Sequence, residues 1–416
     1  MKVIFRSLTH RNYRLFFVGQ GISLIGTWMQ RIAISWLVYR LSNSALLLGL
    51  VGFASQIPTF LLAPFAGALA DRWNRQRMLV VIQTLAMIQA LILAFLIYRE
   101  TIVIWQIVLL SIFLGCVNAF DIPTRQSFVV DMVENKEDLG NAIALNSSLV
   151  NGARLLGPSV AGILIAAVGE GMCFLLNGIS YIAVIIALLS MRIASKEPVV
   201  HKTRILQEVK EGFTYVFRVG PIRSILLLFA LVSFMGMPYQ VLMPLFAGEV
   251  FHGGPDTLGF LMGATGIGAL IGTFYLASRK NAIGLGKITV STAGIFGIGL
   301  VVFSLSRLLW VSLLFMILTG FGMMVQMASG NTILQTIVDD DKRGRVMSFY
   351  TVAFMGMAPF GNLLAGELAD KIGAPNTILL SGVCCILGAL IFIKKLSSVL
   401  EEAHPEIPKK DFINLS

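Results

Sequence analysis

The chain has 416 residues, of which 56% are hydrophobic and 13% are charged, whereas about a quarter of a soluble domain is charged. A soluble fold could not cover so much apolar surface with so few charges, so the composition indicates a surface that faces lipid. The net charge of +10 would first suggest nucleic acid as a partner. Because the Lys and Arg residues lie between apolar runs, we expect them to set membrane topology instead, and we predict no nucleic-acid partner.

Twelve apolar runs follow one another along the chain, and a run of about 20 residues crosses the hydrocarbon core as a helix. The sequence therefore predicts an all-α membrane protein of twelve transmembrane helices. The predicted spans are residues 15–40, 45–70, 78–98, 102–123, 141–168, 172–191, 222–247, 257–277, 287–306, 309–335, 345–369 and 376–394.

The distribution of positive charge predicts which way these spans run. With the N-terminus inside, 26 of the 32 Lys and Arg residues lie in cytoplasmic segments and 4 lie in the opposite loops. The remaining two, Arg31 and Arg154, lie within spans. Cytoplasmic loops carry the excess of Lys and Arg in membrane proteins, so we expect both termini to be cytoplasmic.

The two halves of the chain resemble each other. Gly157, Gly162 and Gly169 match three glycines that lie 204 residues later, and the preceding loops align nearly as well. Both halves start inside, so the repeat is parallel, as in transporters that move two six-helix bundles around a central site. The predicted domains are a first bundle at 1–191, a cytoplasmic linker at 192–221, a second bundle at 222–395 and a cytoplasmic tail at 396–416.

The loop between spans 2 and 3 reads G-A-L-A-D-R-W-N-R-Q-R and contains Gly67, Asp71, Arg72, Arg75 and Arg77. The glycine allows close helix approach, Asp71 can accept hydrogen bonds, and the arginines can bind carboxylates or lipid phosphates. A positive turn that only closes a hairpin is the alternative. The combination resembles the signature loop of the major facilitator superfamily, which implies a conformational role for these residues.

Span 5 carries N-G-A-R-L-L-G-P-S-V-A-G, in which Pro158 lies between Gly157 and Gly162. Proline removes a backbone hydrogen bond and bends the helix, and the glycines allow tight packing. This segment is similar to the Gly-Pro motif of antiporters in the same superfamily, although an ordinary kinked span would look alike.

Three further segments, at 8–20, 121–128 and 341–350, resemble the bacterial efflux branch that includes enterobactin exporters and macrolide efflux proteins. The resemblance covers roughly residues 5–395. It implies the major facilitator fold, export and a place in the bacterial inner membrane, and it names no substrate.

Ionisable residues inside the bilayer are expensive and usually functional. Arg31, Asp121 and Arg154 are the candidates in the first half, and the resemblance implies that their spans face a central cavity. We expect a proton-coupling or substrate site there, with a permanent structural ion pair as the alternative. The direct pairing of Asp121 with Arg154 is left open by their depths. The full candidate set also includes four polar residues, which are Gln30, Asn151, Gln326 and Asn331.

The sequence thus predicts a secondary exporter of an amphipathic small molecule, driven by protons and working by alternating access. The alternatives are an uptake facilitator, a lysolipid or lipid flippase, and a membrane sensor without transport. No Walker A sequence is present, and the four histidines and four cysteines show no metal-ligand spacing. We therefore predict no enzymatic activity, cofactor or metal, and a monomer whose partners are lipid, protons and the small molecule.

Overall fold

The computed structural model describes residues 6–70, 73–133, 135–193, 213–279, 284–338 and 342–403. Every regular element within these ranges is helical. The chain divides into two compact units, Met1–His201 with Ala247–Gly263, and Lys202–Phe246 with Ala264–Ser416. The segment 247–263 therefore groups with the first half of the chain. The predicted domain boundaries stay predictions, and most of the predicted linker and tail lies outside the described residues.

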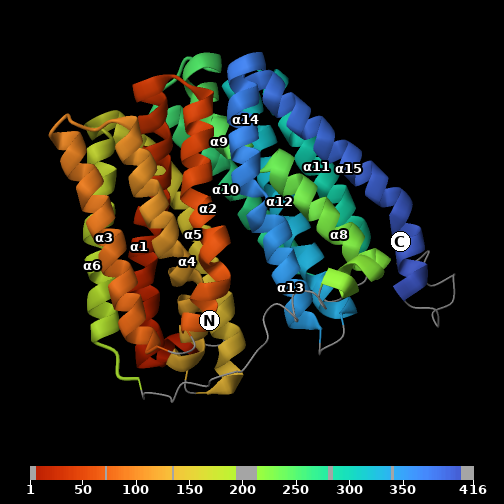
Figure 1. The fold of residues 1–416 in the computed structure, drawn as a ribbon, viewed down its shortest axis with the longest axis horizontal. Helices are drawn as coiled ribbons and strands as arrows, with labels where there is room; N and C mark the ends of the chain where they lie inside the picture. The colour runs from red at the N-terminus through yellow and green to blue at the C-terminus, as the bar shows by residue number, and fades with distance from the viewer. Residues whose placement is uncertain are drawn as a thin grey trace. The chain divides into compact units, whose positions relative to one another are not determined.

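The first unit is built from six long helices. They are α1 (Arg11–Ser42), α2 (Ala45–Ala70), α3 (Arg75–Tyr98), α4 (Ile104–Met132), α5 (Leu139–Val168) and α6 (Glu170–Leu189). Helix α1 packs against α5 and α6, α3 lies beside α6, and α2 lies beside α4 (Figure 1). Helix α1 is therefore the element that joins the others.

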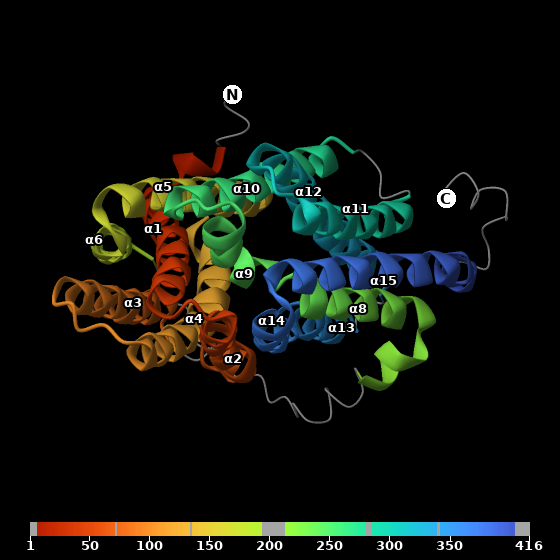
Figure 2. The ribbon, with the colours of Figure 1, turned by 90° about the horizontal axis from the view of Figure 1, so that it is seen from above.

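The second unit repeats this plan with more interruptions. Its elements are α8 (Gly220–Leu231), η3 (Val232–Gly236), α9 (Tyr239–Leu245), α11 (Leu285–Leu305), α12 (Leu309–Ile337), α13 (Arg343–Thr351), η5 (Val352–Gly356), α14 (Ala358–Ile372) and α15 (Ala374–Ala403). Along the chain, η4 (Phe246–Val250) and α10 (Pro255–Ala277) follow α9 and precede α11. Both contain a boundary between the two units, because residues 247–263 belong to the first unit. Helix α15 lies between α11 and α8 (Figure 2).

Eleven helices in the described part of the chain are long and apolar enough to cross a membrane. They match eleven of the predicted spans, with ends that differ by a few residues; the largest changes are at α4, which continues to Met132, and at α15, which continues to Ala403. Helix α1 is the twelfth long helix, with 32 residues, or about 48 Å. Four arginines and two buried glutamines lower its hydropathy. The predicted all-helical fold is confirmed.

Two glycines show that the predicted repeat is structural. Gly169 ends α5 with φ = 81°, and Gly373 ends α14 with φ = 86°. Residues with a side chain rarely adopt such a positive φ, whereas glycine adopts it readily. Each glycine is followed directly by the sixth helix of its half, so the 204-residue offset relates equivalent corners of the fold.

The N-terminal segment is held against the start of α5. The short helix η1 (Arg6–Thr9) buries Ser7 completely, and its hydroxyl donates to the Asp138 carbonyl at 2.8 Å. Both Arg6 and His10 contact the Asp138 carboxylate. We call these four residues the N-terminal clasp. It fixes the beginning of α1 relative to α5.

Candidate functional site

The candidate site lies in the first unit and begins with Asp121 on α4. This residue is 8% exposed, and its Oδ1 accepts a hydrogen bond from Gln83 Nε2 on α3 at 2.9 Å. Its Oδ2 lies 2.9 Å from a guanidinium nitrogen of Arg125, one turn further along the same helix. We call Asp121 and Arg125 the α4 ion pair. The structure thus gives Asp121 an arginine partner on the same helix, beyond the predicted end of span 4 at residue 123.

Arg31 and Arg154 come together on a single aromatic ring. The guanidinium carbon of Arg31 lies 4.6 Å from the centre of the Trp28 ring, and that of Arg154 lies 5.4 Å from it. Both distances fall within the range of cation–π attraction. We call Trp28, Arg31 and Arg154 the Trp28 cluster. It joins α1 to α5 and brings the two arginines to one ring, while their role in a substrate site stays a prediction.

A glycine makes this approach of α1 and α5 feasible. A Cβ atom added to Gly157 would overlap Cβ of Trp28 and lie 3.1 Å from the Ile25 carbonyl oxygen. Only hydrogen fits at this position, so Gly157 brings the backbone of α5 directly against the residue that carries the ring. The following Pro158 is buried within α5.

The cluster and the ion pair belong to one electrostatic environment. The charges of Arg154 and Arg125 both act on Arg31, and the buried phenol of Tyr181 on α6 lies near Arg31, Arg125 and Asp121. Arg31, Arg125, Arg154 and Asp121 therefore lie in one region of the first unit.

The predicted polar residues of this unit are bonded within it. Gln30 donates to Gln89 on α3 at 2.8 Å and accepts from Asn177 on α6 at 2.7 Å, which ties α1 to both helices. Asn151 donates to the Ser147 carbonyl of its own helix at 3.0 Å. These contacts describe packing, and a role for either residue in a cavity stays a prediction.

Helix α12 of the second unit carries the two remaining polar candidates. Gln326 is 1% exposed, and neither its amide nitrogen nor its amide oxygen has a hydrogen-bond partner among the described residues. Asn331 accepts a hydrogen bond from Gln335 at 2.9 Å on the same helix. A buried amide without partners is costly, so Gln326 is the more informative of the two.

The signature loop is described only in part. Asp71 and Arg72 lie outside the described residues, and for Gly67 only its position in α2 is described. Arg75 places a guanidinium nitrogen 2.8 Å from the Asp131 carboxylate, which ties the start of α3 to the end of α4. The backbone N–H of Arg77 is capped by the Asn74 side chain at 3.0 Å. The proposed conformational role stays a prediction.

The second glycine of the span 5 motif also permits a close helix contact. A Cβ atom on Gly162 would lie 2.7 Å from the Pro255 carbonyl oxygen and 2.9 Å from Cα of Gly259. Gly259 is equally tight against the Pro158 carbonyl oxygen, at 2.8 Å. The motif thus packs α5 against the first turns of α10 within the first unit.

Four site residues were missed by sequence reasoning: Trp28, Gln83, Arg125 and Tyr181. Arg125 lies four residues after Asp121, which is the spacing of a helical ion pair, but the predicted span ends at residue 123 and leaves Arg125 in the following loop. Trp28 lies three residues before Arg31, a spacing that could also have been used. For Gln83 and Tyr181, no signal distinguishes them from other polar residues in helices.

Comparisons with known proteins agree with this architecture. The chain is 27% identical to the staphyloferrin A transporter of Staphylococcus aureus, over 94% of this chain and 98% of that protein. It is 25% identical to macrolide efflux protein A of Streptococcus pyogenes, over 92% and 96%. Among solved structures, an inward-facing bacterial homologue of the lysosomal transporter Spinster has a TM-score of 0.71 at 15% identity, over 94% of this chain and 98% of that one.

The decisive match is to a protein family. Residues 4–413 match the family described as transmembrane secretion effector, which spans nearly the whole chain. The predicted resemblance to the efflux branch of the superfamily is confirmed by this match and by the efflux relatives. The chain therefore belongs to the transmembrane secretion effector family and is a multi-pass secondary transporter of the major facilitator superfamily that exports small molecules.

Proposed function

We propose that this chain is a proton-coupled exporter of an amphipathic small molecule with negative charge, and that it works by alternating access. The observation that carries the proposal is the Trp28 cluster, in which two guanidinium groups share one aromatic ring. A guanidinium stacked on a ring keeps its N–H groups at its edge, where a carboxylate can bind through two hydrogen bonds. Two such groups side by side suit an anion better than a neutral solute.

Methionine is concentrated in the second half of the sequence, where eleven of the 18 methionines lie between Met235 and Met357. Methionine is flexible and polarizable, and it suits surfaces that accept varied apolar ligands. Gln326, in the same half of the sequence, carries a buried amide with no hydrogen-bond partner among the described residues. These features support an amphipathic substrate.

The α4 ion pair is the proposed link to protons. While Asp121 is ionised, it holds the guanidinium of Arg125 at 2.9 Å. A proton on Asp121 would remove the negative charge and release Arg125 toward the two arginines of the Trp28 cluster. A bound anion would then be favoured when Asp121 carries a proton and disfavoured when it does not, which makes Asp121 the proposed coupling residue.

Replacement of Asp121 by asparagine tests this assignment. We expect Asp121→Asn to abolish substrate-dependent proton movement in proteoliposomes, followed with a pH-sensitive dye, and to keep substrate binding. Glu170→Gln is the matched control, because this carboxylate also pairs with an arginine, Arg40 at 2.8 Å, but at the far end of α1. Undiminished proton movement in Asp121→Asn would exclude it as the coupling residue.

Staphyloferrin A and a macrolide are the first probes, because two relatives are known by these substrates. Thermal stabilisation of the purified protein identifies which probe binds. The direction of flux in vesicles separates an exporter from an uptake facilitator, and extraction of labelled lipid from one leaflet tests a flippase. We further propose that the chain acts as a monomer in the bacterial inner membrane with both termini in the cytoplasm, which the distribution of Lys and Arg supports.

A further inference from the structure

The second unit contains a short motif twice. Residues 232–237 read V-S-F-M-G-M and residues 352–357 read V-A-F-M-G-M, so five of the six positions are identical. The motif lies within what the sequence predicts as the seventh and eleventh spans. This 120-residue offset differs from the 204-residue offset between the two halves, so the repeat of the halves does not explain the second copy of the motif.

Both copies form the same unusual backbone. They are the π-helical elements η3 (Val232–Gly236) and η5 (Val352–Gly356), each of which interrupts a longer α-helical span. In η3, the Met237 N–H donates to the Val232 carbonyl five residues earlier, at 3.0 Å. Such wide turns are rare, and they occur mostly where function requires them.

A proline removes one α-helical hydrogen bond just beyond each turn. Pro238 follows η3 and Pro359 follows η5. Proline has no N–H, so the carbonyls of Phe234 and Met355, four residues earlier, lose their α-helical partners. The Phe234 carbonyl instead packs against Gly361 of α14, where a Cβ atom would collide with it. The sequence thus removes an α-helical hydrogen bond beside each wide turn.

A hydrogen bond joins the two turns. The hydroxyl of Ser233, which is fully buried, donates to the Phe354 carbonyl oxygen. The rings of Phe229 and Phe354 are also in contact, with centroids 6.0 Å apart. Ser233 is the position at which the two copies differ, since the second copy has Ala353 there. The side chain that joins the turns is therefore the side chain that distinguishes them.

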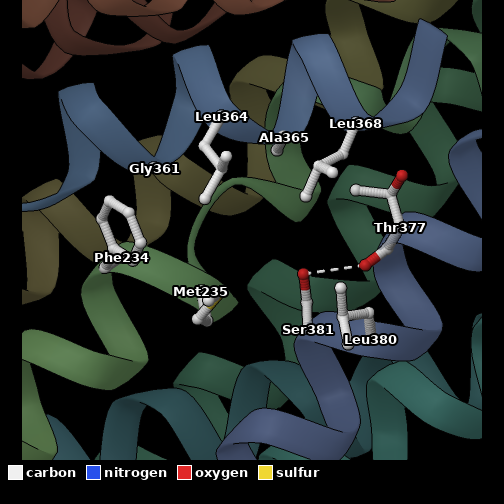
Figure 3. Close-up of a pocket in the computed structure, with 9 residues that line it drawn as sticks. All are labelled: Phe234, Met235, Gly361, Leu364, Ala365, Leu368, Thr377, Leu380 and Ser381. Carbon is white, nitrogen blue, oxygen red and sulfur yellow. Dashed lines mark hydrogen bonds between the residues drawn. The ribbon is translucent and has the colours of Figure 1, made fainter. Parts of the chain in front are cut away.

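An apolar crevice adjoins the first turn. It is lined by Phe234 and Met235 of η3, by Gly361 and Leu364 of α14, and by Leu380 and Ser381 of α15 (Figure 3). The Ser381 hydroxyl is bonded to the Thr377 carbonyl of its own helix at 2.9 Å, so the crevice is effectively apolar. The crevice is narrow, with space for about one water molecule beside Phe234 and Met235.

We propose that Ser233 is a positioning residue that couples the two π-helical turns, so that both change their hydrogen bonding together during the transport cycle. A change from π to α spacing shifts the following helix by one residue, which is about 1.5 Å along the axis and about 100° around it. Because Ser233 binds the Phe354 carbonyl, a change in one turn alters the other.

Hydrogen–deuterium exchange of the full chain in lipid nanodiscs tests the coupling without a substrate. Ser233→Ala converts the first copy into the sequence of the second, which already forms a π-helical turn, so the fold should tolerate it. We expect amide exchange to rise several-fold in both segments, 232–239 and 352–359. Ser304→Ala is the matched control, because this serine is also buried but bonds to Val301 of its own helix at 2.7 Å.

An increase confined to residues 232–239, or one that Ser304→Ala reproduces in both segments, would overturn the coupling. In proteoliposomes with whichever of the two probes is transported, Ser233→Ala should also lower the turnover several-fold and leave the KM unchanged. An unchanged turnover would overturn the role in transport. The exchange experiment needs no substrate and no proton gradient, so its failure is distinct from a failure of the proposed function.

Discussion

The Trp28 ring contacts both arginines of its cluster within the first unit. Each guanidinium lies within 6 Å of the ring centre, and a cation–π contact at an exposed site contributes about 0.5–1 kcal/mol. The ring therefore offsets part of the repulsion between two neighbouring cations. At this scale the site depends on a residue with no charge of its own.

Replacement of Trp28 by leucine should weaken the binding of an anionic substrate. Loss of the ring leaves both arginines without their common contact, and a loss of about 1.4 kcal/mol reduces affinity roughly tenfold. Trp36→Leu is the control, because this ring contacts Tyr39 of the same helix, with centroids 5.3 Å apart. Thermal-shift titration with the probe that binds measures both variants. Equal losses in the two would show that the Trp28 ring serves packing alone.

At the scale of single elements, α5 shows how two glycines of one helix can differ. The position of Gly157 has no room for a Cβ atom, whereas a Cβ atom on Gly152 would meet nothing within 4 Å. We expect Gly157→Ala to destabilise the protein by about 1–3 kcal/mol, because overpacking forces α5 away from α1. Gly152→Ala should be neutral or slightly stabilising. Melting temperatures in detergent compare the two, and similar values would contradict the packing argument.

The N-terminal clasp should respond to pH. The hydrogen bond from His10 lowers the pKa of Asp138 below its ordinary value of 3.8; burial opposes this effect, and the charge of Arg6 adds to it. A lowered pKa in the folded state stabilises the clasp at pH values above about 4, and this stabilisation is lost as the pH falls through the folded-state pKa. Asp138→Asn removes the same interaction at pH 7.

Amide exchange at Ser7, whose N–H donates to Asn141 Oδ1 at 3.0 Å, reports the state of the clasp. We expect faster exchange in Asp138→Asn than in the unaltered chain at pH 7. Glu137→Gln is the control, since only the backbone carbonyl of this residue contacts Arg6. Equal exchange in all three proteins would mean that the carboxylate does not hold the segment.

For the whole molecule, the charge split predicts the topology of the loops. A phosphatase fused at Arg99 or Arg307 should be active, because these residues lie in the sparsely charged loops after α3 and α11. A fusion at Lys202, in the strongly basic region between the halves, should be inactive. The opposite pattern of activity would reverse the orientation of the entire chain.

Much of the fold could be predicted because the bilayer sets the length and hydropathy of each span independently of the other spans. The long helices, the family and the glycines that end α5 and α14 all follow from local residue patterns. The resemblance to the major facilitator superfamily implied one neighbourhood for Arg31 and Arg154, and the structure brings both guanidinium groups to Trp28. The Arg125 partner of Asp121 was not predicted, because the predicted span ends at residue 123, whereas α4 continues through Pro123 to Met132.

The sequence by itself determined that this is a twelve-helix transporter of two repeated halves, since lipid imposes length and hydropathy on every helix alone. The tertiary structure decided which side chains meet. Examples are the ring shared by Arg31 and Arg154, the bond from Ser233 to Phe354 and the burial of the Gln326 amide. Each depends on the rotation of a helix about its axis, which neighbouring helices set and hydropathy leaves open.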